Sequence, residues 1–172
     1  SGGIVVPLLL ERLGVEPIKL HCTPDGHFPH NPEPLKAHLT DLSEKVVQTG
    51  ADFGIAVDPD VDRLAFMDEQ GALFGEEYTL VACADFVLGQ KKGNTVSNLS
   101  STRALRDVTQ KHGGTYTASA VGEVNVVHAM KANRAVIGGE GNGGIILPEA
   151  HFGRDALVGI ALFLSLLAEK QI

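Results

Sequence analysis

Three aspartates alternate with other residues in one short segment of the sequence. Asp58, Asp60 and Asp62 directly follow the apolar run from Phe53 to Val57, which is typical of a buried strand. If the chain stays nearly extended after that strand, alternate side chains point to the same side. Crowded carboxylates repel one another unless a cation lies between them, and hard oxygen ligands favour Mg²⁺ or Ca²⁺. The pattern predicts a magnesium site with these three aspartates as ligands.

Arg63 completes this segment, which we call the acidic loop (residues 58–63). Its planar guanidinium suits phosphate, so a cation and an arginine together indicate phosphoryl transfer. A solvated acidic turn is one alternative. A calcium-binding EF-hand loop with Glu69 at its twelfth position is another, but Arg63 replaces the glycine that its sharp turn requires. Residues 55–62 also resemble the haloacid dehalogenase superfamily of phosphatases, in which Asp58 would be the nucleophile.

A second motif is the glycine-rich loop, residues 139–144. It matches G-x-G-x-x-G in form, but residues 145–148 continue as a strand and a proline, where a bound pyrophosphate requires the N-terminus of a helix. No Lys-Ser or Lys-Thr pair follows, so the loop is not a P-loop either. It presents the Glu140 carboxylate and the Asn142 amide, on either side of Gly141, to a polar ligand such as a sugar hydroxyl. A purely structural hairpin is the alternative.

Several other polar residues are explained by local structure. Glu123 opens a predicted helix, where a carboxylate interacts favourably with the helix dipole. Ser100 and the two residues after it precede another predicted helix and suit an N-cap. Arg154 and Asp155 are explained by the start of the last predicted helix.

The elements that must position these residues alternate between helix and strand. The apolar residues switch repeatedly between a helical period and short continuous runs, which is typical of βαβ units. This predicts the α/β class: two consecutive small βαβ-type domains, residues 1–70 and 71–172, each with a mixed, mostly parallel sheet covered by helices. The predicted helices are 4–13, 35–49, 76–88, 102–112, 124–131 and 154–169, and the predicted strands are 15–20, 53–57, 64–67, 95–98, 115–119, 135–138 and 145–147.

Charge and composition exclude several classes of protein. The 172 residues are 44% apolar and 20% charged, which is a globular composition. The net charge of -7 belongs entirely to residues 1–70, which hold 5 Lys and Arg against 12 Asp and Glu. There is no basic stripe for nucleic acid and no apolar run long enough to span a membrane, and the two cysteines indicate neither a disulfide framework nor a zinc site. We therefore expect no nucleic acid or membrane partner and a cytoplasmic location.

Taken together, the motifs resemble those of the α-D-phosphohexomutase family. The family's metal loop, Asp-Gly-Asp-x-Asp-Arg, is similar to residues 58–63, with Pro59 in place of the glycine. Its sugar loop, Gly-Glu-x-Ser-Gly, is similar to residues 139–143, with Asn142 in place of the serine. The Pro-Asp-Gly-x-Phe-Pro stretch and the Gly-Arg-Asp helix start are matched at 24–29 and 153–155. The resemblance covers essentially the whole chain as the family's second and third domains, with the first strand of the second domain missing before Ser1.

The resemblance implies a phosphohexomutase that interconverts hexose or hexosamine 1-phosphate and 6-phosphate, with glucosamine, mannose and glucose phosphates all candidates. It implies a phosphoserine in a first domain, a hexose bisphosphate intermediate and a phosphate clamp in a fourth domain. The motif that bears that serine is absent from this chain, so domains I and IV of the same protein are expected partners and the chain alone is expected to be inactive. A non-catalytic sugar-phosphate-binding module is a further alternative. The site residues implied are Asp58, Asp60 and Asp62 for Mg²⁺, Arg63 for phosphate, and Glu140, Gly141, Asn142, Glu123 and Ser100 for the sugar.

Overall fold

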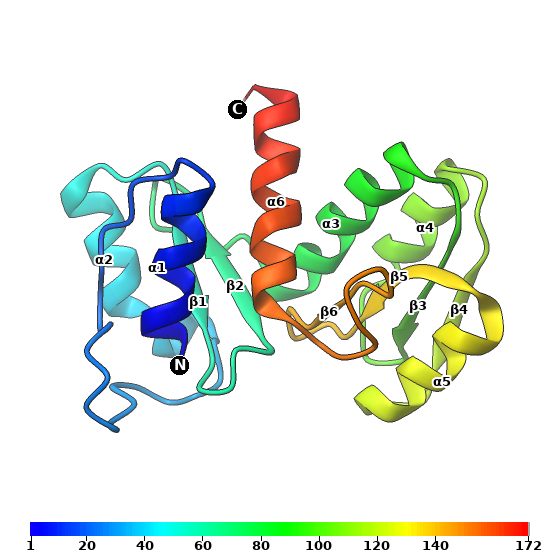
Figure 1. Ribbon diagram of the computed structural model, residues 1–172, viewed down its shortest axis with the longest axis horizontal. Coiled ribbons are helices and arrows are strands. Elements are labelled where there is room, and N and C mark those ends of the chain that lie inside the picture. The colour runs from blue at the N-terminus through cyan, green and yellow to red at the C-terminus, as the bar shows by residue number, and fades with distance from the viewer. Residues whose placement is uncertain (172) are drawn as a thin grey trace.

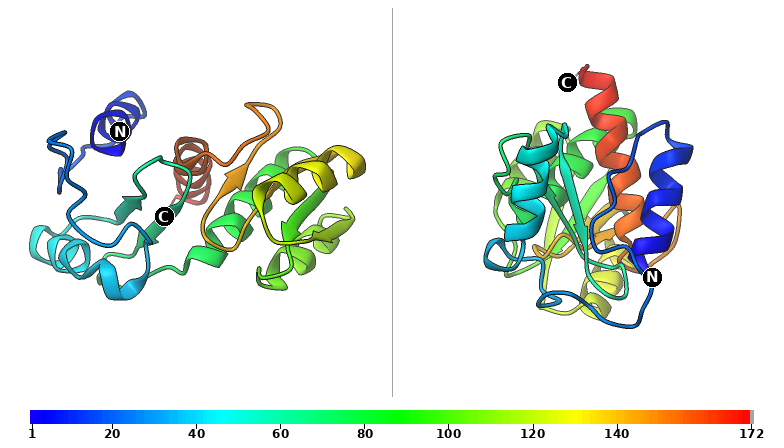
Figure 2. Two further views of the ribbon diagram at one scale, coloured as in Figure 1. Left: turned by 90° about the horizontal axis from the view of Figure 1, so that it is seen from below. Right: turned by 90° about the vertical axis from the view of Figure 1, so that its left-hand side faces the viewer.

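The computed structural model describes residues 1–171, and it consists of two α/β units that lie side by side (Figure 1). The last helix, α6 (Ala156–Lys170), stands between the two units, and Figure 2 shows the same placement from below. The predicted α/β class is confirmed. No helix within residues 1–171 has the length and apolar character needed to cross a membrane.

The first unit is built around one antiparallel strand pair. Strands β1 (Gly54–Val57) and β2 (Leu64–Met67) pair with Val57 opposite Leu64, so the acidic loop is the connection between them. Helices α1 (Gly2–Arg12) and α2 (Thr40–Thr49) flank this hairpin, and a short 3₁₀ helix (Lys36–His38) precedes α2. The hairpin fixes both ends of the acidic loop.

Three predictions for the first unit are wrong. Its sheet is not mixed and mostly parallel, because the two strands described there pair antiparallel. The predicted strand at 15–20 is not a strand, because no strand among the described residues pairs with it; these residues and β1 instead line an open space. Pro17 would also leave one ladder hydrogen bond unmade there. The predicted helix at 35–49 is interrupted at Leu39, whose backbone leaves helical geometry (φ -114°, ψ 24°) and whose side chain packs with Ala65 and Met67.

The second unit contains the mixed, mostly parallel sheet that the sequence predicts. Its strands, in the spatial order β4-β3-β5-β6, are β3 (Asn94–Asn98), β4 (Tyr116–Ser119), β5 (Ala135–Gly139) and β6 (Ile145–Ile146). Only β6 is antiparallel to its neighbour, so β5, the glycine-rich loop and β6 form a hairpin. The helices α3 (Glu76–Gln90), α4 (Ala104–Lys111) and α5 (Glu123–Asn133) complete the unit. The carboxyl ends of the parallel strands therefore meet beside that hairpin, where α/β proteins commonly bind ligands.

The two units share one hydrophobic core. Leu64 and Phe66 of β2 pack with buried residues of α3, β5 and α6. The rings of Phe66 and Phe163 are stacked with centroids 4.0 Å apart. A Cβ atom at Gly159 would lie only 2.7 Å from a methyl carbon of Leu64, so α6 approaches β2 closely. The strand that follows the acidic loop is therefore held against the helix that follows the glycine-rich loop.

Candidate functional site

The acidic loop is a tight turn and not the extended segment that the sequence suggested. Oδ1 of Asp58 accepts hydrogen bonds from the backbone N–H groups of Asp62 (2.9 Å) and Arg63 (3.0 Å). Val61 has φ 65°, a left-handed conformation that is costly for a β-branched residue. The turn still gathers the carboxylates, because one oxygen from each of Asp58, Asp60 and Asp62 lies within 4.8 Å of the others. The expected clustering is present, but by a different backbone path.

The electrostatics of this cluster fit a hard divalent cation. Burial, the main cause, and the neighbouring carboxylates of Asp58 and Asp60 raise the pKa of Asp62 to about 6, while Arg154 opposes the shift. Oδ1 of Asp62 is buried and has no hydrogen-bond partner in the part of the chain that the structure describes. A cation bound by the three aspartates would neutralise the repulsion and give this oxygen a partner. The residues present therefore suit Mg²⁺, as the sequence predicts.

Arg63 connects the acidic loop to the proline-rich segment before α2. Its Nη1 donates to Glu33 Oε1, and this contact is the main cause of the raised pKa of Arg63. Its Nε lies 3.7 Å from Asp58 Oδ2 and 4.0 Å from Asp62 Oδ1. Sequence reasoning missed Glu33, because no local pattern indicates which loop carboxylate reaches an arginine 30 residues away.

The glycine-rich loop lies directly against the start of β2. Its turn is closed by Glu140 N–H donating to Gly144 O (3.0 Å) and Gly144 N–H donating to Asn142 Oδ1 (3.1 Å). Gly143 has φ 82°, and a Cβ atom there would lie 1.9 Å from the carbonyl oxygen of Leu64. Only glycine allows this approach without displacement. The two motifs that the sequence singled out are therefore neighbours in space.

Glu140 is buried and organises three segments of the second unit. Its Oε1 accepts from Asn98 Nδ2 (2.8 Å) and Gly122 N–H (3.1 Å), and its Oε2 accepts from Arg154 Nη1 (3.0 Å). A carboxylate has about four acceptor positions, so Glu140 keeps one on Oε2 for a ligand. Asn98 had no predicted role, and it lies here because β3 ends beside β5.

Arg154 forms ion pairs with three carboxylates of the site, whereas the sequence pattern indicated only the start of a helix. Its guanidinium pairs with Asp62, with Glu140 Oε2 (3.0 Å) and with Glu123 Oε2 (3.4 Å). Its backbone N–H donates to Glu123 Oε1 (3.0 Å). Helix α6 begins after it, with Asp155 as the N-cap accepting from Leu157 N–H (2.8 Å). The carboxylate of Glu123 thus has a partner far more specific than a helix dipole.

The predicted N-cap around Ser100 is wrong. The N-cap of α4 is Arg103, without a side-chain cap hydrogen bond, because Ser101 Oγ instead donates to Asn98 Oδ1 (2.5 Å). Thr102 Oγ1 reaches Ala104 N–H only at 3.4 Å. Ser100 itself lines the pocket described next.

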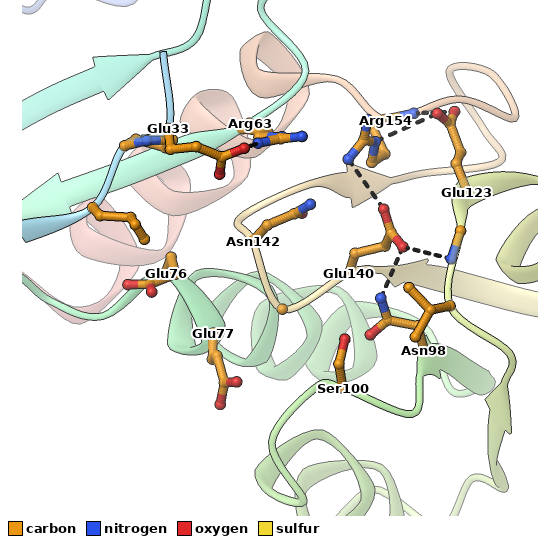
Figure 3. Close-up of a pocket in the computed structure, with 15 residues that line it drawn as sticks. Glu33, Arg63, Glu76, Glu77, Asn98, Ser100, Glu123, Glu140, Asn142 and Arg154 are labelled. Atoms are coloured by element: carbon orange, nitrogen blue, oxygen red, sulfur yellow. Dashed lines mark hydrogen bonds and ion pairs between the residues drawn. The ribbon is translucent and has the colours of Figure 1, made fainter. Parts of the chain in front are cut away.

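The site surrounds a pocket of about 510 Å³ between the two units (Figure 3). Glu33 and Arg63 line it from the first unit, and the second unit supplies the other residues labelled in the figure. Among the predicted sugar and phosphate residues, those that line it are Arg63, Ser100, Glu123, Glu140, Gly141 and Asn142. The three aspartates are not among the lining residues, but Asp58 and Asp62 form ion pairs with Arg63, and Asp62 also pairs with Arg154, both of which line the pocket.

The pocket lining carries more negative than positive charge. Two guanidinium groups face five carboxylates, which are Glu33, Glu76, Glu77, Glu123 and Glu140. Such a lining repels a phosphate group unless a bound cation offsets the carboxylates. The fold and the site together define an α/β protein whose polar pocket between two units suits a hydroxyl-rich ligand together with a cation.

Comparison with known protein families identifies the family of this chain. Residues 1–71 match the family model described as phosphoglucomutase/phosphomannomutase, alpha/beta/alpha domain II, and residues 74–172 match the model for domain III. The chain belongs to the phosphoglucomutase/phosphomannomutase family, the α-D-phosphohexomutases, which confirms the family predicted from the motifs.

Individual relatives agree with this assignment. The phosphoglucomutase/phosphomannomutase of Thermococcus kodakarensis is 36% identical over 172 residues, covering 99% of this chain and 38% of that protein. The phosphoglucosamine mutase of Nitratidesulfovibrio vulgaris is 36% identical over 170 residues, covering 96% of this chain and 37% of that protein. The crystal structure of a phosphoglucomutase/phosphomannomutase family protein from Burkholderia thailandensis superimposes with a TM-score of 0.88 at 29% identity, covering 98% of this chain and 38% of that one. The chain thus spans well under half the length of these relatives.

Proposed function

We propose that this chain supplies domains II (1–70) and III (71–172) of a magnesium-dependent phosphohexomutase. The enzyme would interconvert hexose or hexosamine 1-phosphate and 6-phosphate through a phosphoserine and a hexose bisphosphate, with domains I and IV supplied outside these residues. The observation that carries the proposal is the close approach of the two loops. The glycine-rich loop touches Leu64 of β2, and one pocket is lined from both units.

In this proposal the residues of the chain manage charge and orientation. Asp58, Asp60 and Asp62 hold the cation, and Mg²⁺ supplies neutralisation of the negative charge that develops on a phosphoryl group in transfer. Arg63 exchanges Glu33 for a substrate phosphate, since a phosphate matches its donor fork as well as a carboxylate does. Both partners of that ion pair line the pocket, so the exchange needs only side-chain movement.

The second unit would orient the sugar. Asn142 and Glu140 both line the pocket, and their side chains can bind hydroxyl groups (Figure 3). Glu123 and Ser100 line the same pocket from α5 and from the end of β3, where they can contact the other end of a sugar. A pocket of about 510 Å³ is of the size that accommodates a hexose phosphate.

The cation assignment is tested by calorimetric titration of the chain with Mg²⁺. We expect Asp60→Asn to lower the affinity at least tenfold, because one of three anionic ligands becomes neutral. Asp52→Asn is the matched control, since Asp52 is exposed and outside the loop, and it should leave the affinity unchanged. Equal affinities for both variants would overturn the assignment.

The mutase assignment is tested in a chimera in which this chain replaces the matching 38% of the Thermococcus kodakarensis relative. We expect glucose 1-phosphate to be converted to glucose 6-phosphate by the chimera and not by its Asp60→Asn version. The chain alone should release no phosphate from either sugar. Phosphate release with a covalent adduct on Asp58 would instead favour the aspartyl phosphatase. Turnover that survives Asp60→Asn would leave only a sugar-phosphate-binding role for these residues.

A further inference from the structure

One guanidinium lies between the two motifs. Arg154 donates through Nη2 to Asp62 of the acidic loop and through Nη1 to Glu140 of the glycine-rich loop, and its Nε lies 3.4 Å from Glu123 Oε2 at the start of α5, an ion pair without a hydrogen bond. Figure 3 shows the side chain reaching between Glu123 and Glu140 at the edge of the pocket. Only 13% of its side chain is exposed, so solvent screens these ion pairs weakly. Among the residues that the structure describes, no other cation has ion pairs with both loops.

The surrounding backbone is shaped around this side chain. A Cβ atom at Gly144 would lie 2.4 Å from Arg154 Cδ, so the glycine leaves the path open for the arginine. On its C-terminal side, Asp155 N–H donates to Ile145 O (2.8 Å) and Ala156 N–H donates to Val61 O (3.0 Å). The two residues that follow Arg154 are thus hydrogen-bonded to the residue after the glycine-rich loop and to the turn of the acidic loop. This placement is too specific for a helix start alone.

We propose that Arg154 is a positioning residue that couples cation binding at the acidic loop to the conformation of the sugar-binding side of the pocket. The proposal rests on the cation assignment under the proposed function. A divalent cation and Arg154 compete for the charge of Asp62. When the cation takes that charge, the guanidinium interacts more strongly with Glu140 and Glu123 and tightens their geometry. The better-ordered Glu140 then binds a sugar more tightly. Because coupling between two binding sites is reciprocal, a sugar bound to Glu140 raises the affinity for the cation by the same factor.

Arg63 cannot supply this coupling, although it also forms ion pairs with the aspartates. Its ion pairs are with Asp58, Asp62 and Glu33, all within the first unit. Arg154 comes from the second unit and contacts carboxylates of both. The coupling is therefore a specific property of Arg154 and can be removed without removing the cation ligands.

The experiment is a titration of the ¹⁵N-labelled chain with Mg²⁺ alone, followed by ¹H–¹⁵N correlation spectra. Binding at the acidic loop is read from the amides of residues 60–63, and the distant response is read from the Gly122 amide and the Asn98 side-chain amide, both of which donate to Glu140. In the unmodified chain we expect both sets of signals to shift with one midpoint. These spectra report the cation and its effect without any need for turnover.

Two substitutions separate positioning from charge. In Arg154→Met the acidic loop should still bind Mg²⁺, about tenfold more tightly because a like charge beside the site is gone, while Gly122 and Asn98 no longer respond. Arg154→Lys keeps the charge, but one ammonium group cannot contact three carboxylates as the planar fork does. We expect near-normal Mg²⁺ affinity with a reduced shift at Gly122, and this variant carries the test if the methionine variant does not fold.

Arg103→Met is the matched control. Arg103 is 73% exposed on the second unit, and its one ion pair within residues 1–171 is with Asp107 one helical turn away, so its loss should change neither midpoint nor response. The proposal is overturned if Gly122 and Asn98 shift in Arg154→Met as they do in the unmodified chain, or if they stay still in the unmodified chain while the acidic loop binds. Absence of any Mg²⁺ binding would overturn the cation assignment itself, which is a different result.

Discussion

Gly143 is the position at which the contact between the two loops is most sensitive to substitution. It has φ 82°, and a Cβ atom there would lie 1.9 Å from Leu64 O and 2.8 Å from Leu64 C. Both atoms are backbone atoms of a strand in the shared core, so they cannot rotate away. Gly143→Ala therefore forces the glycine-rich loop and β2 apart, which should destabilise the fold and disturb the pocket.

The expected loss in the free energy of unfolding for Gly143→Ala has two parts. A left-handed conformation costs an alanine about 1–2 kcal/mol, partly offset by the lower entropy of the unfolded chain, for a net cost of about 1 kcal/mol. Overpacking that moves backbone costs about a further 2 kcal/mol. Gly113 supplies the control, because its φ is 77° but nothing lies within 4 Å of a Cβ atom there. We expect losses in the free energy of unfolding of about 1 kcal/mol for Gly113→Ala and about 3 kcal/mol for Gly143→Ala.

The measurement is urea unfolding followed by far-ultraviolet circular dichroism. Because the two units share one core, we expect a single transition for each variant. Its midpoint and slope together give the free energy of unfolding of that variant. If the two alanine variants lose the same stability, the loops do not approach each other as described, and the pocket between the units loses its main support. A larger loss for Gly113→Ala would contradict the reasoning altogether.

Three further predictions concern single side chains. Thr79→Val should leave stability unchanged or raise it by up to about 1 kcal/mol in urea unfolding, because Thr79 Oγ1 is buried with no hydrogen-bond partner among the described residues; a clear loss would contradict this. The hydrogen bond from His112 (2.7 Å) holds the pKa of Asp85 below its usual 3.8, so this interaction stabilises the fold above that pH and is lost as the pH falls through the lowered value. Asp85→Asn should therefore cost about 0.5 kcal/mol at pH 5 and progressively less as the pH falls below 3.8. Glu33→Gln should free Arg63 and tighten glucose 6-phosphate binding several-fold by calorimetry in the presence of Mg²⁺, and an unchanged affinity would refute this competition.

Much of the second unit could be predicted because its elements follow local patterns. Strands β5 and β6 are short apolar runs on either side of a glycine-rich loop, and each lies within a residue or two of its predicted bounds. The same holds in the first unit for the end of α2, where Gly50 (φ 63°) takes the left-handed position that terminates helices. Periodicity and chain-breaking residues are properties of a few neighbouring side chains, so they can be read without the fold.

The wrong predictions have the opposite cause, because they concern contacts between residues that are far apart in the sequence. A strand exists only if another strand offers hydrogen-bonding groups beside it, and nothing within residues 15–20 says whether one does. Leu39 leaves the helical path where its side chain enters the space beside Ala65, which is a contact with a strand 26 residues later. The same limit hid Glu33 and Arg154, whose partners are distant in sequence.

The sequence by itself determined the chemistry available to this protein. Three aspartates followed by an arginine, and a glutamate and an asparagine among glycines, are residue types and spacings that fold-independent reasoning can assign to a cation, a phosphate and a sugar. Only the tertiary structure decided that the two motifs share one pocket and that Arg154 joins them. Ion pairs between residues as much as 92 positions apart depend on how α6 packs between the units, and that packing is set by the common core and not by any local pattern.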